Sequence, residues 1–198
     1  MFNNLNIVIG ITGGIATYKA CGIINYLKKE GANIYVIMTE NATKFITPLT
    51  LEVLSGNKVV VDMFERPDHI DVEHISLARK ADLFLVVPAT ANILGKVANG
   101  IADDMLSTTI MATKAPVVFA PAMNNGMFEN PIVENNIKIL KEYGYRFVEP
   151  ITGHLACGYE AKGKLAKNED IVNYVKVLMK EDKRWKNLLL LQVVLVKK

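Results

Sequence analysis

Four short polar segments of this chain have residue types that could do chemistry, and each directly follows an apolar run. They occupy residues 12–14, 39–43, 89–92 and 121–125. All four carry hydroxyl, amide or small side chains, which can hydrogen-bond a ligand or let it approach the backbone closely. If the apolar runs are parallel strands, the segments meet at the sheet edge where ligands of such folds bind. We therefore expect one binding site there.

The first of these segments lies in Gly10-Ile11-Thr12-Gly13-Gly14-Ile15-Ala16 and favours a phosphate-containing ligand. Glycines allow a tight turn, and a helix that follows them points N–H groups at an anion. The spacing is not the Gly-x-Gly-x-x-Gly of dinucleotide sites, and the lysine of a P-loop is absent. A mononucleotide therefore fits better than NAD, although an ordinary turn from strand to helix remains the alternative.

The remaining hydroxyl and amide candidates have a structural interpretation beside the functional one. Thr39, and Thr90 with Asn92, stand at expected helix starts, where they either cap a helix or bind a ligand. Ser107 lies within an expected helix and either reaches a phosphate or bonds to the preceding turn. Asn124 follows a strand and can hold a carboxylate or simply form a turn.

Two titratable residues are candidates for proton transfer. His74 could act as a base if a substrate proton lies within reach, although a lone histidine is more often structural. Cys157 lies in a polar, glycine-containing segment and could be an acid or a nucleophile, whereas Cys21 lies in an apolar helix and is expected in the core. The histidines and cysteines have no metal-ligand spacing, so we expect no metal.

The elements that must position these residues are visible in the hydrophobic pattern. Short apolar runs, rich in β-branched residues and without polar alternation, are typical of strands buried on both faces. These runs span residues 5–11, 33–38, 81–88, 115–120 and 145–148, and helical patterns lie at 15–29, 91–99, 103–113 and 131–142. The alternation predicts an α/β fold with a single doubly wound parallel sheet.

Composition excludes several classes of protein. The 198 residues are 51% hydrophobic, enough for a large core, and the apolar excess suggests a buried subunit interface. The 23 basic and 20 acidic residues are mixed and form no basic stripe with aromatics, so we expect no nucleic-acid partner. No apolar run reaches the roughly 20 residues of a membrane helix, and no secretory signal is visible. We therefore expect a cytoplasmic protein without a membrane partner.

In their order along the chain, five motifs resemble the phosphopantothenoylcysteine decarboxylases of the homo-oligomeric flavin-containing cysteine decarboxylase family. They are TGGIA at 12–16, HISLA at 74–78, PATAN at 88–92 with GIADD at 100–104, PAMNNGMF at 121–128 and LACG at 155–158. The resemblance covers about residues 4–180 and implies a flavodoxin-like, Rossmann-type three-layer fold. It also implies bound FMN and an assembly built from trimers, possibly a dodecamer, with sites at the subunit interfaces.

The resemblance also implies roles for single residues. His74 is expected to be catalytic, Asn124 to hold the substrate carboxylate, and Cys157 to donate a proton late in the cycle. Substrate binding is expected to involve Met127, Ala156 and Lys164 as well. The residues expected to contact FMN are Gly13, Gly14, Ile15, Thr39, Thr90, Ala91, Asn92 and Ser107.

The implied reaction converts 4'-phosphopantothenoylcysteine to 4'-phosphopantetheine in coenzyme A synthesis. Flavin takes a hydride equivalent from the CH₂–SH group and leaves a thioaldehyde, which acts as the electron sink for loss of CO₂. Loss of CO₂ leaves an enethiol, and the reduced flavin then returns its electrons to this enethiol. Three positions depart from the family pattern: Phe128 replaces Trp, Ala161 replaces Gly, and Lys164 replaces Arg. Lysine keeps the charge but loses the bidentate fork of arginine.

Other interpretations stay open at this point. A peptidyl-cysteine decarboxylase or prenyl-flavin synthase is a sister possibility, a non-catalytic flavoprotein regulatory subunit is another, and a generic NAD-binding domain is a third. The combination of PAMN with LACG favours the coenzyme A branch. Retention of His74, Asn124 and Cys157 together argues against a non-catalytic subunit.

The chain is expected to divide into a decarboxylase domain at 1–182 and a tail at 183–198. In many bacteria such a domain is fused to a synthetase domain that begins near a Thr-Ala-Gly-Gly-Thr stretch. One codon choice for LQVVL at 191–195 encodes that stretch in another frame. We hypothesise that the tail is a truncated or frameshifted start of a synthetase domain; the alternative is a genuine short element that packs on the oligomer.

Overall fold

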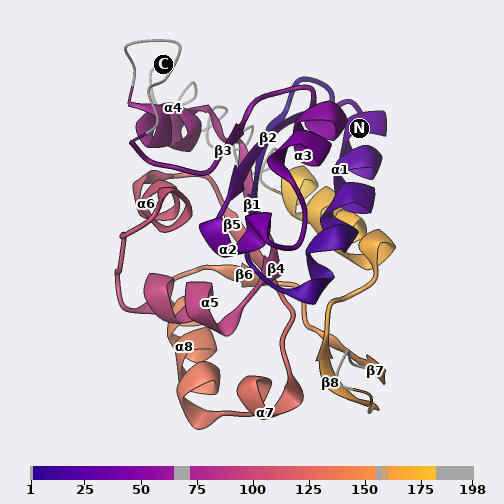
Figure 1. Cartoon of the computed structure of the whole chain (residues 1–198), viewed down its shortest axis with the longest axis vertical. Coiled ribbons are helices and arrows are strands. Elements are labelled where there is room, and N and C mark those ends of the chain that lie inside the picture. The colour runs from indigo at the N-terminus through magenta and orange to yellow at the C-terminus, as the bar shows by residue number, and fades with distance from the viewer. Residues whose placement is uncertain (1, 65–71, 155–157, 159, 182–198) are drawn as a thin grey trace, which may run out of the picture.

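A parallel six-stranded sheet forms the centre of the molecule (Figure 1). The computed structural model describes residues 2–64, 72–154, 158 and 160–181. The strand order is β3-β2-β1-β4-β5-β6. The strands are β1 (Asn6–Ile11), β2 (Asn33–Met38), β3 (Val59–Val60), β4 (Leu83–Ala89), β5 (Val117–Pro121) and β6 (Arg146–Phe147).

From β1 the chain adds β2 and β3 on one side, and it then returns to add β4, β5 and β6 on the other side. The strand order therefore reverses between the neighbours β1 and β4. Without the two-residue edge strand β3, the order is the 2-1-3-4-5 of flavodoxin-like sheets. The predicted doubly wound, flavodoxin-like fold is therefore confirmed. Ligands of such sheets bind at this reversal, beyond the carboxyl ends of the strands.

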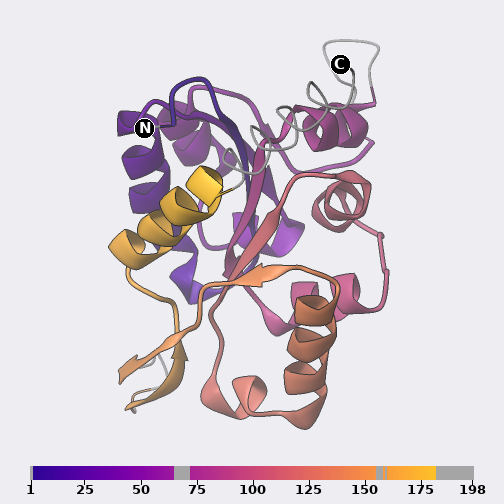
Figure 2. The same ribbon diagram turned by 180° about the vertical axis from the view of Figure 1, so that it is seen from behind.

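Helices cover both faces of the sheet, as Figures 1 and 2 show from opposite sides. One face is covered by η1 (Ile15–Lys19), α1 (Ala20–Lys29), α3 (Pro48–Ser55) and a helix at 168–181. The other is covered by α4 (Glu73–Lys80), α5 (Ala91–Ala98), α6 (Met105–Ala112) and α8 (Pro131–Glu142). Two short helices, α2 (Glu40–Thr43) and α7 (Asn125–Phe128), follow strands β2 and β5.

Side chains of the central strands alternate between two hydrophobic cores. In β1, Ile7 and Ile9 belong to the core that includes α1, whereas Val8 belongs to the core that includes α5 and α6. Every residue of β4 is buried. This two-sided burial explains why the runs read as continuous apolar sequence.

An antiparallel hairpin, β7 (Ile151–His154) with β8 (Glu160–Lys164), lies beyond the carboxyl edge of the sheet, at the end where α7 lies (Figure 2). It was not predicted, because its polar and glycine residues give no apolar alternation. The expected tail at 183–198 lies outside the described residues, so the frameshift remains a hypothesis. Within the described part of the chain, no helix combines the length and apolar character needed to cross a bilayer.

Candidate active site

A cavity of about 940 Å³ opens at the carboxyl edge of the sheet, at the reversal of strand order. Its volume lies within the range of about 300–1,000 Å³ typical of ligand pockets. It is bounded by the segments that follow β1, β2, β4 and β5 and by strand β8. The predicted site residues that line it are Gly13, Gly14, Ile15, Thr39, Thr90, Ala91, Asn92, Asn124, Met127 and Lys164.

Of the two glycines after β1, the rest of the described chain requires only the first. A Cβ atom at Gly13 would lie 2.6 Å from the Cβ of Asn41 and 2.8 Å from its backbone carbon, so the segment after β2 excludes any side chain there. A Cβ atom at Gly14 would meet only the Thr90 Cγ2 atom, at 3.9 Å. Gly14 also has an extended backbone that any residue adopts. Nothing in the described chain therefore requires glycine at position 14, and a side chain there would occupy the cavity.

The threonines after β2 and β4 are N-cap residues, as their structural interpretation predicted. Thr39 caps α2 by position, but its hydroxyl makes no capping hydrogen bond. Thr90 caps α5 and accepts a long hydrogen bond of 3.5 Å from the amide of Ile93. Both residues line the cavity, so a capping position and a ligand-facing position coincide here.

Asn124 and strand β8 of the hairpin lie next to each other in the wall of the cavity. The Asn124 Oδ1 atom accepts a hydrogen bond of 2.8 Å from the amide of Gly126 and caps α7. The neighbouring amide of Met123 donates to the carbonyl of Gly163 in β8, at 3.0 Å. A Cβ at Gly163 would collide with the Met123 carbonyl oxygen, so only glycine permits this approach. The contact brings Lys164 into the cavity wall.

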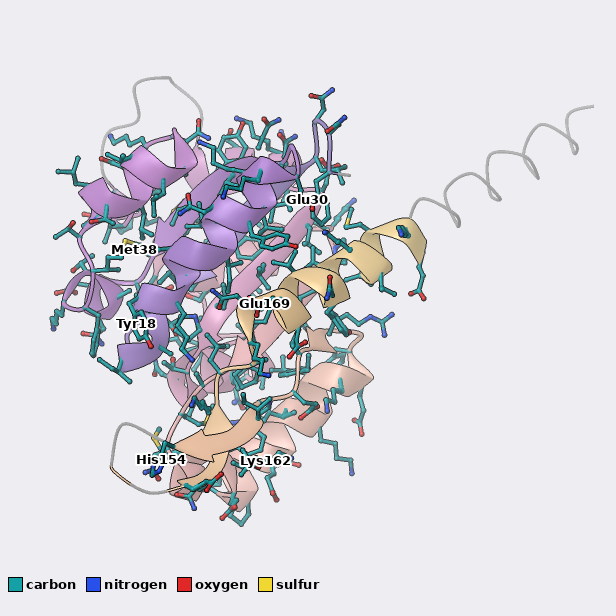
Figure 3. The ribbon with its side chains drawn as sticks, turned by 90° about the vertical axis from the view of Figure 1, so that its right-hand side faces the viewer. Tyr18, Glu30, Met38, His154, Lys162 and Glu169 are labelled. Atoms are coloured by element: carbon teal, nitrogen blue, oxygen red, sulfur yellow. The ribbon has the colours of Figure 1, made fainter. Side chains whose placement is uncertain are left out.

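The cavity contains two lysines close enough to affect each other. Burial first, and then the charge of Lys164, lower the pKa of Lys19 below its ordinary value. Like charges placed together are costly unless an anion lies between them. Figure 3 shows Tyr18, the neighbour of Lys19 in η1, above the hairpin that carries His154 and Lys162. This side of the cavity is therefore suited to a phosphate or carboxylate.

A second charged group joins α5 to α6 at another wall. Lys96 Nζ lies 2.6 Å from Asp103 Oδ1 and 2.7 Å from Asp104 Oδ2, and Lys96 and Asp104 line the cavity. Burial alone would lower the pKa of Lys96, but its hydrogen bonds to the two carboxylates outweigh burial and raise it. Neither Lys96 nor Asp104 was expected in the site, although Asp103 and Asp104 belong to the GIADD motif.

Two predicted site residues do not line the cavity of their own chain. Ser107 is fully buried in the first turn of α6, where it forms a capping box with Asp104. His74 lies on α4, which in Figure 1 is at the opposite end of the sheet from α7 and the hairpin. Its Nδ1 atom is buried and has no hydrogen-bond partner among the described residues. Ala156 and Cys157 lie outside the described residues.

Several cavity residues were not singled out from the sequence, although Asn41 and Met123 lie within two of the expected polar segments. Tyr18, Lys19, Asn41, Met123 and His154 all line it, alongside the predicted residues. Lys19 could have been suspected, because it lies early in the helical segment that follows the glycines. Within the described ranges, no group of three or more His, Cys, Asp or Glu side chains could hold a metal ion.

Comparison with known proteins identifies the family. The family model described as Flavoprotein matches residues 1–180. The chain belongs to the Flavoprotein family. The family expected from the sequence motifs is thus confirmed, and the cavity at the reversal of strand order is the candidate site of a Flavoprotein member.

Curated relatives in this family carry names from coenzyme A synthesis. The chain is 51% identical over 172 residues to the coenzyme A biosynthesis bifunctional protein CoaBC of Bacillus subtilis, covering 87% of this chain and 42% of the relative. It is 53% identical over 181 residues to the CoaBC of Borreliella burgdorferi, covering 91% and 45%. The chain thus spans less than half the length of these bifunctional relatives. A Streptococcus mutans protein named "Probable phosphopantothenoylcysteine decarboxylase" is 42% identical over 172 residues, covering 86% of this chain and 96% of the relative.

Solved structures of Flavoprotein-like folds agree with this assignment. A PPC decarboxylase mutant complexed with pantothenoylaminoethenethiol superposes with a TM-score of 0.80 at 28% identity, covering 90% of this chain and all of that chain. The FMN-dependent cysteine decarboxylase SpaF superposes with a TM-score of 0.79, also at 28% identity, covering 91% and 99%.

Proposed function

We propose that this chain is an FMN-dependent decarboxylase that converts 4'-phosphopantothenoylcysteine to 4'-phosphopantetheine in coenzyme A synthesis. The observation that carries the proposal is the single cavity shared by the Gly13–Gly14 turn, the segment from Thr90 to Asn92, and Asn124. It has the chemistry for a flat cofactor on one side and a carboxylate on the other. The relatives named for the same pathway, at 51% and 53% identity, support this choice of substrate.

The cavity residues fit a bound FMN. Gly14 leaves open a volume that a side chain would fill, and Thr39, Thr90 and Asn92 offer hydroxyl and amide groups around it. The small side chain of Ala91 allows close approach of a ring. When bound, FMN would supply a reversible two-electron oxidation that gives the substrate the electron sink an ordinary cysteine carboxylate lacks, with no net redox change.

In this proposal, the substrate is held by cavity residues other than those around FMN. The Asn124 amide group holds the carboxylate without adding an opposite charge that would oppose loss of CO₂. Lys19 and Lys164 attract the phosphate, which relieves their mutual repulsion. Met127 supplies apolar surface beside them. The chain thereby fixes both ends of the substrate and leaves the thiol free to face the cofactor.

Proton transfer is assigned to His74 and Cys157. Because His74 lies on α4 and does not line the cavity of its own chain, we propose that it serves the cavity of a neighbouring copy. A homo-oligomer built from trimers would provide this neighbour and would cover the exposed Phe45, Leu49 and Val53. The assignment of Cys157 as the proton donor rests on the LACG motif.

A decarboxylase that acts on another cysteine compound, such as a peptide that ends in cysteine, is the second candidate, because SpaF at 28% identity is described only as an FMN-dependent cysteine decarboxylase. A peptide that ends in cysteine carries no phosphate, however, and would not use the positive charges of Lys19 and Lys164. The lysine pair therefore favours the phosphorylated substrate.

The deciding experiment is a decarboxylation assay on purified protein with FMN. We expect a yellow protein that releases FMN on denaturation and CO₂ from 4'-phosphopantothenoylcysteine, with a product lighter by one CO₂. A cysteine-ended peptide assayed in parallel should react far more slowly. A colourless protein that cannot be reconstituted with FMN would refute the proposal. Faster turnover of the peptide would show that the enzyme acts on peptides and not on 4'-phosphopantothenoylcysteine.

A further inference from the structure

The backbone hydrogen bonds between β1 and β4 end just before the cavity. Beyond that point, side-chain hydroxyl groups hydrogen-bond the two segments to each other. The ladder's last pair is Gly10 with Val86. Two residues further along β4 stands Pro88, which has no N–H to donate. The two segments that face the proposed FMN therefore leave the sheet without a backbone ladder between them.

Thr12 bridges these two segments with one hydroxyl. Its Oγ1 atom donates a hydrogen bond of 2.6 Å to the carbonyl of Pro88 and accepts one of 3.2 Å from the amide of Thr90. Thr12 is only 2% exposed, so water cannot replace either bond. Thr90 is the N-cap residue of α5, so its position sets where that helix begins.

A second buried hydroxyl stiffens the turn on the β1 side. The Thr17 Oγ1 atom lies 2.9 Å from the carbonyl oxygen of Thr12 and 2.5 Å from that of Gly14. Thr17 is fully buried. Together the two threonines close the glycine turn on itself and attach it to the start of α5.

We propose that Thr12 is a positioning residue that holds the Gly13–Gly14 turn and the Thr90–Asn92 segment at the separation that FMN requires. The inference rests on the proposed function and goes beyond it, because Thr12 acts through its backbone partners rather than on the reacting atoms. A site whose edges are held before binding loses less conformational freedom when the ligand arrives. The Thr12 hydroxyl thus contributes to cofactor affinity.

The test compares FMN affinity in Thr12→Val and Thr12→Ser. Valine keeps the volume but leaves the Pro88 carbonyl and the Thr90 amide without a partner, so the Kd for FMN should rise about tenfold. Serine keeps the hydroxyl and should bind within about threefold of the parent protein. The Kd is measured by quenching of FMN fluorescence, and visible circular dichroism of bound FMN should change in the valine variant alone.

Thr109→Val is the matched control. Thr109 is also fully buried and donates a bond of 2.6 Å to a carbonyl, that of Met105, but within α6 and away from the cavity lining. It should lower the melting temperature as Thr12→Val does, while the Kd for FMN stays unchanged. An equal Kd in the parent protein and Thr12→Val overturns the proposal. So does an equal rise in Thr109→Val, since general destabilisation would then explain the effect.

A measurement without ligand separates this inference from the proposed function. In the FMN-free protein, Thr12→Val should speed hydrogen exchange of the Thr90 amide, and Thr12→Ser should not. If the parent protein binds no FMN, the proposed function is wrong. If hydrogen exchange of the Thr90 amide is unchanged in Thr12→Val, the inference that Thr12 bridges the two segments is wrong. If Thr12→Val does not fold, Thr12→Cys keeps the volume with weaker bonds, and unchanged exchange and Kd in that variant overturn the proposal equally.

Discussion

Lys96 Nζ lies 2.7 Å from Asp104 Oδ2, so that the last turn of α5 is tied to the N-cap residue of α6 at the cavity wall. Asp104 also accepts a hydrogen bond of 2.8 Å from the amide of Ser107. One carboxylate thus caps a helix and neutralises a lysine. The two roles can be separated, because asparagine caps a helix as well as aspartate but carries no charge.

Asp104→Asn should therefore destabilise the protein in a pH-dependent way. Burial alone would raise the pKa of Asp104, but the hydrogen bonds from Lys96 and Ser107 outweigh burial and lower it. A carboxyl whose pKa is lower in the folded state stabilises the fold above its unfolded pKa of about 4, and this contribution is lost as the pH falls through the folded value. We expect a loss of about 1 kcal/mol at pH 7 that shrinks toward pH 3, measured by urea unfolding.

Asp103→Asn is the control for this prediction. The Asp103 side chain is 58% exposed, against 29% for Asp104, so its bond to Lys96 is more strongly screened by solvent. Its replacement should have a smaller effect. A penalty for Asp104→Asn that is the same at pH 3 and pH 7 would show that the charge of Asp104 does not stabilise the fold.

Replacements of Gly13 and Gly14 should separate folding from ligand binding. Gly13→Ala places a Cβ against Asn41 and should lower the melting temperature even without FMN. A Cβ at position 14 would meet only Thr90 in the chain itself, and Gly14 lines the cavity, so we expect Gly14→Leu to fold normally but to fill part of the cavity and abolish FMN binding. Thermal melts and FMN titrations of both variants test this. A well-folded Gly14→Leu that still binds FMN would show that the ligand does not approach position 14.

The fold was predictable because its strands have an unmistakable local pattern. The runs that contain Ile7, Val36, Leu85 and Val118 are apolar without interruption, and each became a strand of the central sheet. The hairpin of β7 and β8 was not predictable in this way. Its position against the segment after β5 depends on the contact of Gly163 with the Met123 backbone, which no local pattern in the sequence encodes.

The candidate site was predictable only where its residues directly follow strands. Gly14 and Thr90 could be found because a sheet brings strand ends together. Lys96 could not, since a lysine on a helix looks the same in sequence whether it faces solvent or a cavity, and Lys19 could be suspected only from its position soon after the glycine turn. The position of His74 depends on how helix α4 packs on the sheet, so sequence pattern alone does not place it.

Lys19→Gln should reduce selectivity for a phosphorylated substrate. Burial first, and then the charge of Lys164, lower its pKa, so a second positive charge lies near it in the cavity. Loss of one charge-assisted contact to phosphate should lower kcat/KM for 4'-phosphopantothenoylcysteine at least about tenfold, with little effect on the unphosphorylated analogue. Lys138→Gln, on α8 and outside the cavity lining, is the control and should leave both substrates unaffected. Equal losses of kcat/KM on both substrates would show that Lys19 does not bind the substrate phosphate.

Mixed oligomers should regain activity if His74 serves a neighbouring copy. His74→Asn and Asn124→Asp should each be inactive alone. Co-expressed, they form some sites with an intact His74 from one chain and an intact Asn124 from another, about a quarter of all sites if assembly is random. Decarboxylation by the doubly tagged, co-purified complex measures this recovery.

Asn124→Asp with Gly14→Leu provides the control for complementation. Both residues line the cavity of one chain, so no mixed site contains both in intact form and activity should stay absent. Recovery in the first mixture but not in the second would assign His74 to a neighbour's cavity, in agreement with the position of α4 at the other end of the molecule from the hairpin (Figure 1). If neither mixture recovers although both pairs co-assemble, His74 and Asn124 must act within one chain, and α4 would then have to move toward its own cavity during the reaction.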